Sequence, residues 1–149
     1  MRIFTIGHST KTLEDFISLL KRHGIKLVID VRHYPSSRHH PWFSKESLKK
    51  SLEDEGISYE WIEELGGFRK GGYLSYMQTD EWKGGIEKLM QVANENTAIM
   101  CAEILWWKCH RKFLADYLVE REWEVIHIIG DKKQPHRLNE KRDVKIKCE

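Results

Sequence analysis

Apolar and polar positions along the chain change period several times, from the runs typical of strands to the spacing typical of helices. Residues 2–6 are rich in β-forming residues and end at Gly7, which predicts a first strand. A helix is predicted from Thr12, a residue suited to cap it, to Gly24, where the pattern stops. Residues 25–31 are then almost continuously apolar, as in a strand buried on both faces. The apolar positions of the helix follow the i, i+3, i+4, i+7 spacing of an amphipathic helix: Leu13, Phe16, Ile17 and Leu20.

The alternation of predicted strands and helices continues to residue 129. Strand–helix–strand order of this kind gives parallel strands. We therefore expect a single α/β domain with a mostly parallel sheet of about five strands and helices on both faces. The remaining predicted elements are a helix at 44–55 capped by Ser44, a strand at 57–62, a helix at 79–93 opened by Thr79, a strand at 97–102, a helix around 113–118 and a strand at 123–129.

Residues 64–78 resist assignment, because they contain two glycine pairs and no apolar period. A loop of about fifteen residues is unusual inside a compact domain and favours a lid or a binding loop. The alternative is a crossover that only spans the sheet, and the pattern does not separate the two.

The composition is that of a globular protein of about one domain. Of 149 residues, 40% are hydrophobic and 32% are charged, which is unlike a disordered chain. We expect no membrane association, because no apolar run approaches the roughly 20 residues that cross a bilayer. The apolar stretch at the N-terminus is too short for a secretory signal, and three cysteines suit a reducing compartment, so we expect a cytoplasmic protein.

The net charge of +2 is unevenly distributed. Residues 130–149 contain seven Lys or Arg and four Asp or Glu, whereas residues 1–129 contain 18 and 19. We therefore divide the chain into a domain at 1–138 and a basic tail at 139–149. The tail either contacts an acidic partner such as nucleic acid or is simply a solvated terminus.

Polar side chains follow several of the predicted strands at the points where the strands end. Because ligands bind beyond the carboxyl ends of parallel strands, we expect these residues to lie close together at one edge of the sheet. They are His8 and Ser9 after the first strand, Arg32, Ser37 and Arg38 after the second, Glu103, Cys109, His110 and Arg111 after the fourth, and His127 near the end of the last.

The arginines at this edge predict an anionic ligand. Arg32, Arg38 and Arg111, with Arg69 from the unassigned segment, would attract a phosphate, a nucleotide or a nucleic-acid backbone. The alternative for each arginine is an ion pair within the protein, such as Arg32 with Asp30. Several arginines at one edge favour the anion.

The cysteines do not predict a metal site. Cys101 and Cys109 are eight residues apart, unlike the close pairs of zinc sites, and the adjacent His110 points elsewhere on a helix. A cysteine at a helix start beside Arg111 should have a lowered pKa, which would suit Cys109 as a nucleophile. The alternative is that Cys109 only packs in the core, and the spacing of a cysteine, five residues and an arginine found in phosphatases is absent.

Trp106 and Trp107 could stack a base or cap the hydrophobic core. No phosphate-binding glycine loop, dinucleotide motif or nucleophile elbow is present, and the sequence leaves any cofactor unknown.

Five ordered motifs together resemble one known family, the domain-of-unknown-function family 488. They are "TIGHST", "DVRHYPSSR", "ISYEWIEELGG", "CAEILWWKCHR" and "HII", followed by "QPHRL" as a closing segment. The resemblance runs from Thr5 to about Leu138 and implies a Rossmann-like α/β domain without implying a reaction. One departure is that residues 104–108 are apolar, where the family has a polar, often proline-bearing connection. The family's characteristic polar positions correspond to His8, Ser9, Asp30, Arg32, Ser37, Arg38, Gly66, Gly67, Cys101, Glu103, Cys109, His110, Arg111 and His127.

These observations predict an enzyme or enzyme-like protein that acts on a phosphate-bearing small molecule or nucleic acid. Glu103 or His110 would be the acid or base, and Cys109 a nucleophile. The alternatives are a non-catalytic module that binds nucleic acid or protein, and a redox sensor that uses Cys101 and Cys109. The sequence does not indicate the oligomeric state. The expected ligand-binding residues are His8, Ser9, Arg32, Ser37, Arg38, Gly66, Gly67, Arg69, Arg111 and His127.

Overall fold

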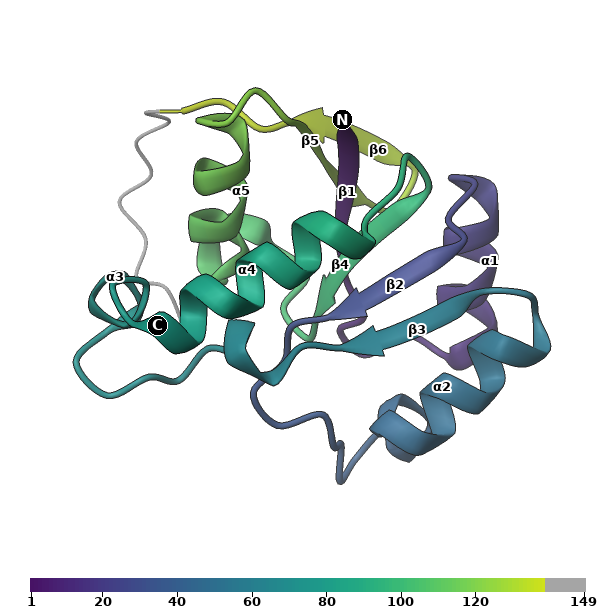
Figure 1. The fold of residues 1–149 in the computed structure, drawn as a ribbon. Helices are drawn as coiled ribbons and strands as arrows, with labels where there is room; N and C mark the ends of the chain where they lie inside the picture. The colour runs from purple at the N-terminus through teal and green to yellow at the C-terminus, as the bar shows by residue number, and fades with distance from the viewer. Residues whose placement is uncertain (139–149) are drawn as a thin grey trace.

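The computed structural model describes residues 1–138, which form a single α/β domain (Figure 1). The predicted basic tail, 139–149, lies outside the described residues. A six-stranded sheet has the order β3-β2-β4-β1-β5-β6, with five parallel strands and an antiparallel β6. The predicted fold class is thus confirmed. The strands are β1 (Arg2–Gly7), β2 (Leu27–Asp30), β3 (Ser58–Trp61), β4 (Thr97–Cys101), β5 (Glu124–Ile129) and β6 (Lys132–Pro135).

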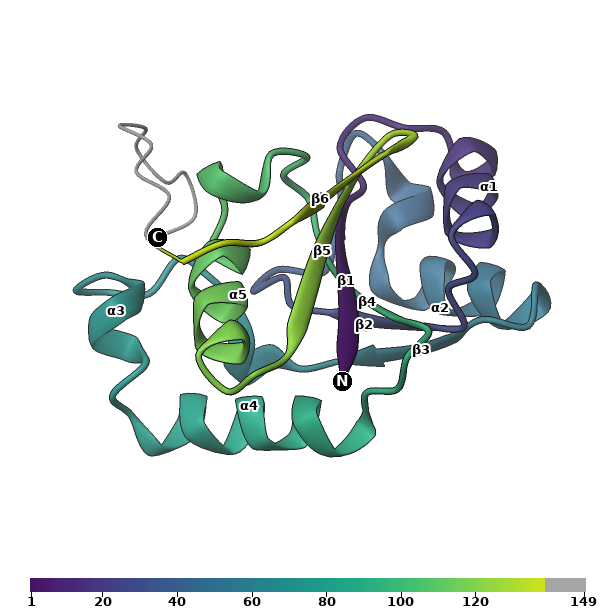
Figure 2. The ribbon, with the colours of Figure 1, turned by 90° about the horizontal axis from the view of Figure 1, so that it is seen from above.

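Helices cover both faces of the sheet, as Figure 2 shows from above. The α-helices α1 (Leu13–Arg22) and α2 (Lys45–Asp54) pack against one face through Phe16, Leu20 and Leu48. On the other face, α4 (Asp80–Val92) and α5 (Arg111–Val119) pack with the short α3 (Tyr73–Tyr76). Three 3-10 turns complete the described chain: η1 (Pro41–Phe43), η2 (Glu63–Leu65) and η3 (Trp106–Lys108).

Two of the three predicted helix caps form hydrogen bonds. The hydroxyl of Thr12 accepts a bond from the amide of Asp15 (3.1 Å), and that of Thr79 accepts one from Trp82 (3.3 Å). Ser44 precedes α2, but its hydroxyl accepts the amide of Ser37 (3.1 Å) instead. Ser44 therefore ties down the loop that follows β2.

The unassigned segment 64–78 is anchored by two tyrosines. The hydroxyl of Tyr73 donates to the Leu65 carbonyl (2.8 Å) and accepts the Trp82 indole N–H (2.9 Å). The hydroxyl of Tyr76 donates to the Glu64 carbonyl (2.7 Å). Both rings are buried, so this segment is held by long-range contacts rather than by a local apolar period.

Strand β6 is a strand that the sequence pattern did not predict. It follows β5 through a turn at Gly130, whose φ of 60° suits glycine. Its residues are mostly exposed and include a proline, which is tolerated at the edge of a sheet. Within residues 1–138, no helix has the length and apolar character needed to cross a membrane.

Candidate functional site

The parallel strands bring the segments after β1, β2 and β4 together at one edge. Gly7 pairs with Cys101 at the end of the β1–β4 register. The amide of His8 donates to the Cys101 carbonyl, and that of Val31 donates to the Met100 carbonyl, both at 2.9 Å. The parallel strand directions therefore bring the residues that follow β1, β2 and β4 close together.

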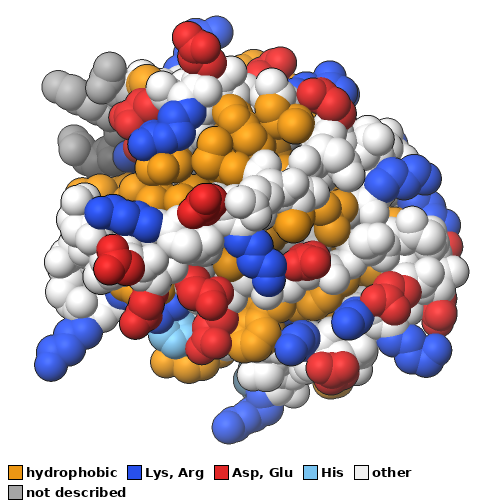
Figure 3. Space-filling view, in the orientation of Figure 1, with side chains coloured by type: hydrophobic (Ala, Val, Ile, Leu, Met, Phe, Trp, Pro, Cys, Tyr) orange, Lys and Arg blue, Asp and Glu red, His pale blue; other side chains and the backbone are white. Residues whose placement is uncertain are grey.

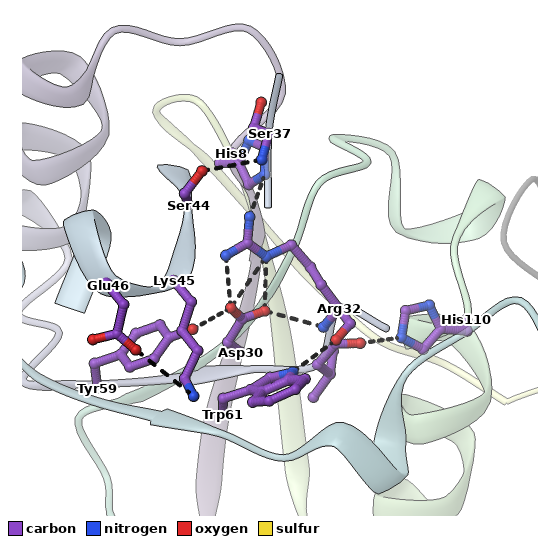
Figure 4. Close-up of polar contacts among 11 residues, drawn as sticks. His8, Asp30, Arg32, Ser37, Ser44, Lys45, Glu46, Tyr59, Trp61 and His110 are labelled. Carbon is purple, nitrogen blue, oxygen red and sulfur yellow. Dashed lines mark hydrogen bonds and ion pairs between the residues drawn. The ribbon is translucent and has the colours of Figure 1, made fainter. Parts of the chain in front are cut away.

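Arg32 forms a buried ion pair with Asp30 at this edge (Figure 4). Its Nε donates to Asp30 Oδ1 (2.9 Å), and its Nη2 donates to Oδ2 (2.7 Å). The Tyr59 hydroxyl also donates to Oδ2, and Asp30 is fully buried. Of the alternatives for Arg32, the internal pair with Asp30 is present.

His8 completes this network as a neutral acceptor. Its Nδ1 donates to the Ser9 carbonyl (2.9 Å), which leaves Nε2 to accept Arg32 Nη1 (3.4 Å). The pKa of His8 is lowered to about 4, mainly by burial and also by the Arg32 charge, against the opposing effects of the bond to the Ser9 carbonyl and of the Asp30 carboxylate. Burial and the Asp30 carboxylate raise the pKa of Tyr59 above its ordinary value. The second N–H on each Nη of Arg32 has no acceptor within residues 1–138.

A pocket of about 300 Å³ opens beside this ion pair, and we call it the edge pocket. At its rim, Tyr34 is 63% exposed and Phe68 is 59% exposed, with ring centroids 6.1 Å apart. Phe68 has a φ of 57°, a conformation that is uncommon outside glycine and marks local backbone strain. The lining residues are Arg32, His33, Tyr34, Phe68, Cys101, Ala102, Glu103 and His110.

Two cysteines and a histidine lie at the inner wall of the edge pocket. The sulfurs of Cys101 and Cys109 are 2.7 Å apart, and His110 Nδ1 is 3.5 Å from the Cys109 sulfur. His110 Nε2 donates to the Val31 carbonyl (2.7 Å), so Nδ1 of the neutral ring is an acceptor. Cys101 lines the pocket, whereas Cys109 is fully buried behind it.

Arg111 is buried beneath residues 102–110, which we call the cysteine loop. Its guanidinium donates to the carbonyls of Glu103 and Ile104 and to the Thr5 hydroxyl. It is not among the residues that line the edge pocket. Burial acts to lower the pKa of Arg111, but the nearby sulfurs of Cys101 and Cys109 raise it above the ordinary value.

A close approach of backbones fixes the start of the cysteine loop. A Cβ at Gly7 would lie 2.0 Å from the Glu103 carbonyl oxygen. Only glycine leaves room for the loop to fold over the end of β1, which explains a glycine immediately after the first strand.

His127 belongs to a chain of hydrogen bonds that runs away from the edge pocket. Arg111 donates to Thr5, the Thr5 hydroxyl donates to His127 Nδ1 (2.6 Å), and His127 Nε2 donates to His136 Nδ1 (2.9 Å). His136 Nε2 donates to Asp116 (2.6 Å), and since that carboxylate can only accept, every bond in the chain runs in one direction. Burial, His136 and Arg111 lower the pKa of His127 to about 2.

Trp106 covers the chain of hydrogen bonds around His127. Its ring stacks on His127 with a centroid distance of 4.3 Å, and its N–H donates to Gln134 (3.2 Å). With 1% of its surface exposed, Trp106 caps the core and is not available to stack a base.

The remaining predicted site residues lie outside the pocket lining. Arg69 donates to the carbonyls of Gly66 (3.0 Å) and Glu63 (2.7 Å), and the Gly67 carbonyl accepts His33 Nδ1 (2.6 Å). The Ser37 hydroxyl accepts the His40 amide (3.0 Å). Arg38 and Ser9 also do not line the pocket, and Arg38 is exposed.

Sequence reasoning missed several residues that the structure brings to the site. Tyr34 and Phe68 carried no local signal because an exposed aromatic residue in a loop fits no periodic pattern. Tyr59 and His136 carried only weak signals, the alternation of β3 and the histidine in "QPHRL". Within residues 1–138, no group of three or more His, Cys, Asp or Glu side chains is arranged to hold a metal ion.

Comparison with solved structures finds the fold elsewhere at low sequence identity. Two crystal structures of a "Putative phosphatase (DUF442)" from Shewanella putrefaciens CN-32 are 15% and 16% identical to this chain, with TM-scores of 0.51 and 0.50. Each alignment covers 79% of this chain and 63% or 66% of the other, so this chain spans about two thirds of their length. At this identity the likeness shows a shared fold alone.

Family membership rests on the sequence itself. No curated protein is similar enough to this chain to count as a relative. A family model, however, matches residues 12–118, a range that includes the Asp30–Arg32 pair and the whole cysteine loop. The chain belongs to the family described as "Domain of unknown function DUF488".

Proposed function

We propose that the edge pocket binds a small phosphate-bearing ligand with a planar ring, such as a nucleotide, and that the protein is an enzyme acting on it. The observation that carries this proposal is the joint presence of Arg32 and an exposed aromatic pair around one pocket. A volume of about 300 Å³ is at the lower end of the range of small-molecule sites.

Arg32 supplies the donors for the phosphate. Asp30 holds the Arg32 guanidinium in place and leaves N–H groups on both Nη atoms for a ligand. His33 Nδ1 donates to the Gly67 carbonyl, which leaves Nε2 of the neutral ring as an acceptor for a hydroxyl or N–H group of the ligand. The word phosphatase in the name of the structural neighbour agrees with a phosphate-bearing ligand.

The cysteine loop is a poor cradle for that phosphate. Loops that bind phosphate direct backbone N–H groups at the anion. Here the carbonyls of Glu103 and Ile104 point inward at Arg111. We therefore assign the phosphate to the Arg32 side of the pocket and not to the loop.

Tyr34 and Phe68 supply a platform for the ring. Large aromatic side chains left exposed at a pocket rim are typical of stacking sites. His33 stacks on Tyr34 with a centroid distance of 4.3 Å, which helps to hold the Tyr34 ring. The strained backbone at Phe68 fits a residue held in place for function.

The reacting groups would be Glu103 and His110, which both line the pocket. Either can act as acid or base toward a bound ligand. If the reaction needs a nucleophilic thiol, Cys101 is placed better than the expected Cys109, because only Cys101 lines the pocket.

A small ligand is favoured over a nucleic acid by the charge distribution. On the face drawn in Figure 3, basic and acidic side chains are intermixed rather than separated by sign. Binding of a nucleic-acid backbone usually needs a continuous basic surface.

Calorimetry with a nucleoside monophosphate, the matching nucleoside and inorganic phosphate tests the proposal. We expect the monophosphate to bind tightest and to raise the melting temperature, because it alone engages both parts of the pocket. Phe68→Ala or Tyr34→Ala should weaken monophosphate binding by roughly 5- to 100-fold and leave phosphate binding unchanged.

Leu74→Ala is the matched control, because Leu74 is a comparably exposed apolar residue that does not line the pocket. Equal binding by Phe68→Ala, Leu74→Ala and the parent protein would refute the stacking platform. If neither the monophosphate nor phosphate binds, the phosphate site itself is wrong.

A further inference from the structure

Cys101 and Cys109 form a pair that the proposed ligand chemistry does not require. Their sulfurs are 2.7 Å apart. Cys101 ends β4 and Cys109 precedes α5, so the cysteine loop begins and ends at the same place in the fold. A covalent bond between two such close sulfurs needs only small movements of the side chains.

The two sulfurs differ in access. Cys101 is among the residues that line the edge pocket, whereas Cys109 is 0% exposed. Cys101 is itself only 3% exposed, so a small molecule in the pocket meets Cys101 through a narrow opening, with Cys109 behind it. This is the arrangement of an attacking thiol with a resolving thiol behind it.

The surroundings favour one negative charge shared by this pair, because a Cys109 thiol can donate to a Cys101 thiolate across the 2.7 Å contact. The Cys109 sulfur accepts the amide N–H of Arg111 at the start of α5 (3.4 Å) and lies 3.5 Å from His110 Nδ1. The buried Arg111 guanidinium adds a positive charge, and the cysteine sulfurs are what raise its pKa. A helix N-terminus and nearby cations are the features that make cysteines reactive.

We propose that Cys101 and Cys109 are a dithiol–disulfide centre that reduces small-molecule disulfides entering the edge pocket. The Cys101 thiolate attacks one sulfur of the substrate, forms a mixed disulfide and releases the other half as a thiolate. Cys109 then gives its proton to His110 Nδ1 and attacks the Cys101 sulfur. The second half of the substrate leaves and takes up the proton. Two electrons pass from the protein to the substrate, and one Cys101–Cys109 disulfide remains.

Each step uses an observed contact. The attack by Cys109 follows the Sγ–Sγ approach, and the proton transfer follows the Cys109–His110 contact. The bond from His110 Nε2 to the Val31 carbonyl keeps Nδ1 turned toward the sulfur. If the cysteines only packed in the core, neither the access of Cys101 nor this orientation of His110 would be needed.

Oxidised glutathione is the probe, and peptide mapping by mass spectrometry is the readout. The full-length protein should lose the Cys101 and Cys109 thiols together, gain a Cys101–Cys109 link and release reduced glutathione. Mapping separates this pair from Cys148, the third cysteine of the chain.

Two single variants test the assigned order. Cys109→Ser should accumulate a stable glutathione adduct on Cys101, because the resolving thiol is missing. Cys101→Ser should form an adduct on Cys109 more slowly by roughly tenfold or more, because Cys109 is buried. In urea the two variants should react at similar rates, which shows that the folded structure causes the difference.

The proposal fails if the parent protein keeps both thiols after equilibration with excess oxidised glutathione. The parent measurement needs no variant, so a variant that does not fold leaves it intact. Equal trapping by both folded variants would overturn the assigned order of attack. Neither result depends on whether a nucleotide binds, so this test and that of the phosphate site can fail separately.

Discussion

Arg32 and Arg111 show how far the meaning of one residue type depends on its neighbours. Both follow strands and both are buried, yet Arg32 faces the Asp30 carboxylate and Arg111 faces backbone carbonyls. Arg32 belongs to a charge-neutral pair with N–H groups left at the pocket. Arg111 instead holds the cysteine loop against Thr5 on β1.

Removing Arg32 should cost far more than removing an exposed arginine. Arg32→Met leaves a fully buried carboxylate at Asp30 without its partner, so we expect a loss of about 3–5 kcal/mol in the free energy of unfolding. The double variant Asp30→Asn, Arg32→Met should recover part of that loss, because the stranded charge is gone. Urea unfolding measures both, and Arg38→Met, at an exposed position, should change stability by no more than about 0.5 kcal/mol. Strictly additive effects of the two substitutions would show that the ion pair is unimportant.

At the scale of the elements, helix α4 contains a contrast between adjacent glycines. A Cβ at Gly84 would meet nothing within 4 Å, whereas a Cβ at Gly85 would lie 2.9 Å from the Glu64 Cβ and 3.2 Å from Leu65. Glycine weakens the first turns of the helix at both positions, but only Gly85 allows η2 to pack closely on α4.

Alanine at these two positions should have effects of opposite sign. Gly84→Ala should stabilise the protein by up to about 1 kcal/mol, because alanine is the better helix former and the site is open. Gly85→Ala should destabilise it, because η2 must shift to accept a methyl group. Thermal or urea unfolding of the two variants decides this, and a similar gain in both would show that η2 is not held tightly against the helix.

The elements that could be predicted are those with a repeating apolar period. The helices α1 and α4 begin at the threonines whose caps the pattern indicated, and β1, β2, β4 and β5 occupy the expected apolar runs. Strand β6 could not be found in this way, because it is a mostly exposed edge strand that turns only one side toward β5. Nor could α3, since its tyrosines are held by bonds to residues 64 and 65 and to Trp82 on α4.

At the scale of the whole molecule, strand direction predicted which edge would gather polar residues but not how they would divide. The edge holds two separate groups. Arg32, Cys101 and His110 line the edge pocket, whereas His127 and His136 lie in a second network that joins β5 and the segment after β6 to α5. The division depends on where the loops turn their side chains, and a linear sequence does not contain that information.

Each of the two groups contains a buried neutral histidine, which should make the stability of the whole protein depend on pH. The pKa of His8 is lowered to about 4 and that of His127 to about 2, in both cases mainly by burial. In the unfolded chain both should titrate near 6.5, so below that pH the unfolded state binds protons that the folded state excludes. The free energy of unfolding is therefore highest above about pH 6.5 and falls as the pH drops toward 4, by about 3 kcal/mol for each histidine.

Urea unfolding between pH 7 and pH 4 measures this slope. His127→Gln and His8→Gln should each reduce it, whereas His39→Gln, at an exposed position, should leave it unchanged. If the slopes of all three variants match that of the parent protein, both histidines take up protons in the folded state over the same pH range as in the unfolded chain, and neither is the buried neutral histidine described above.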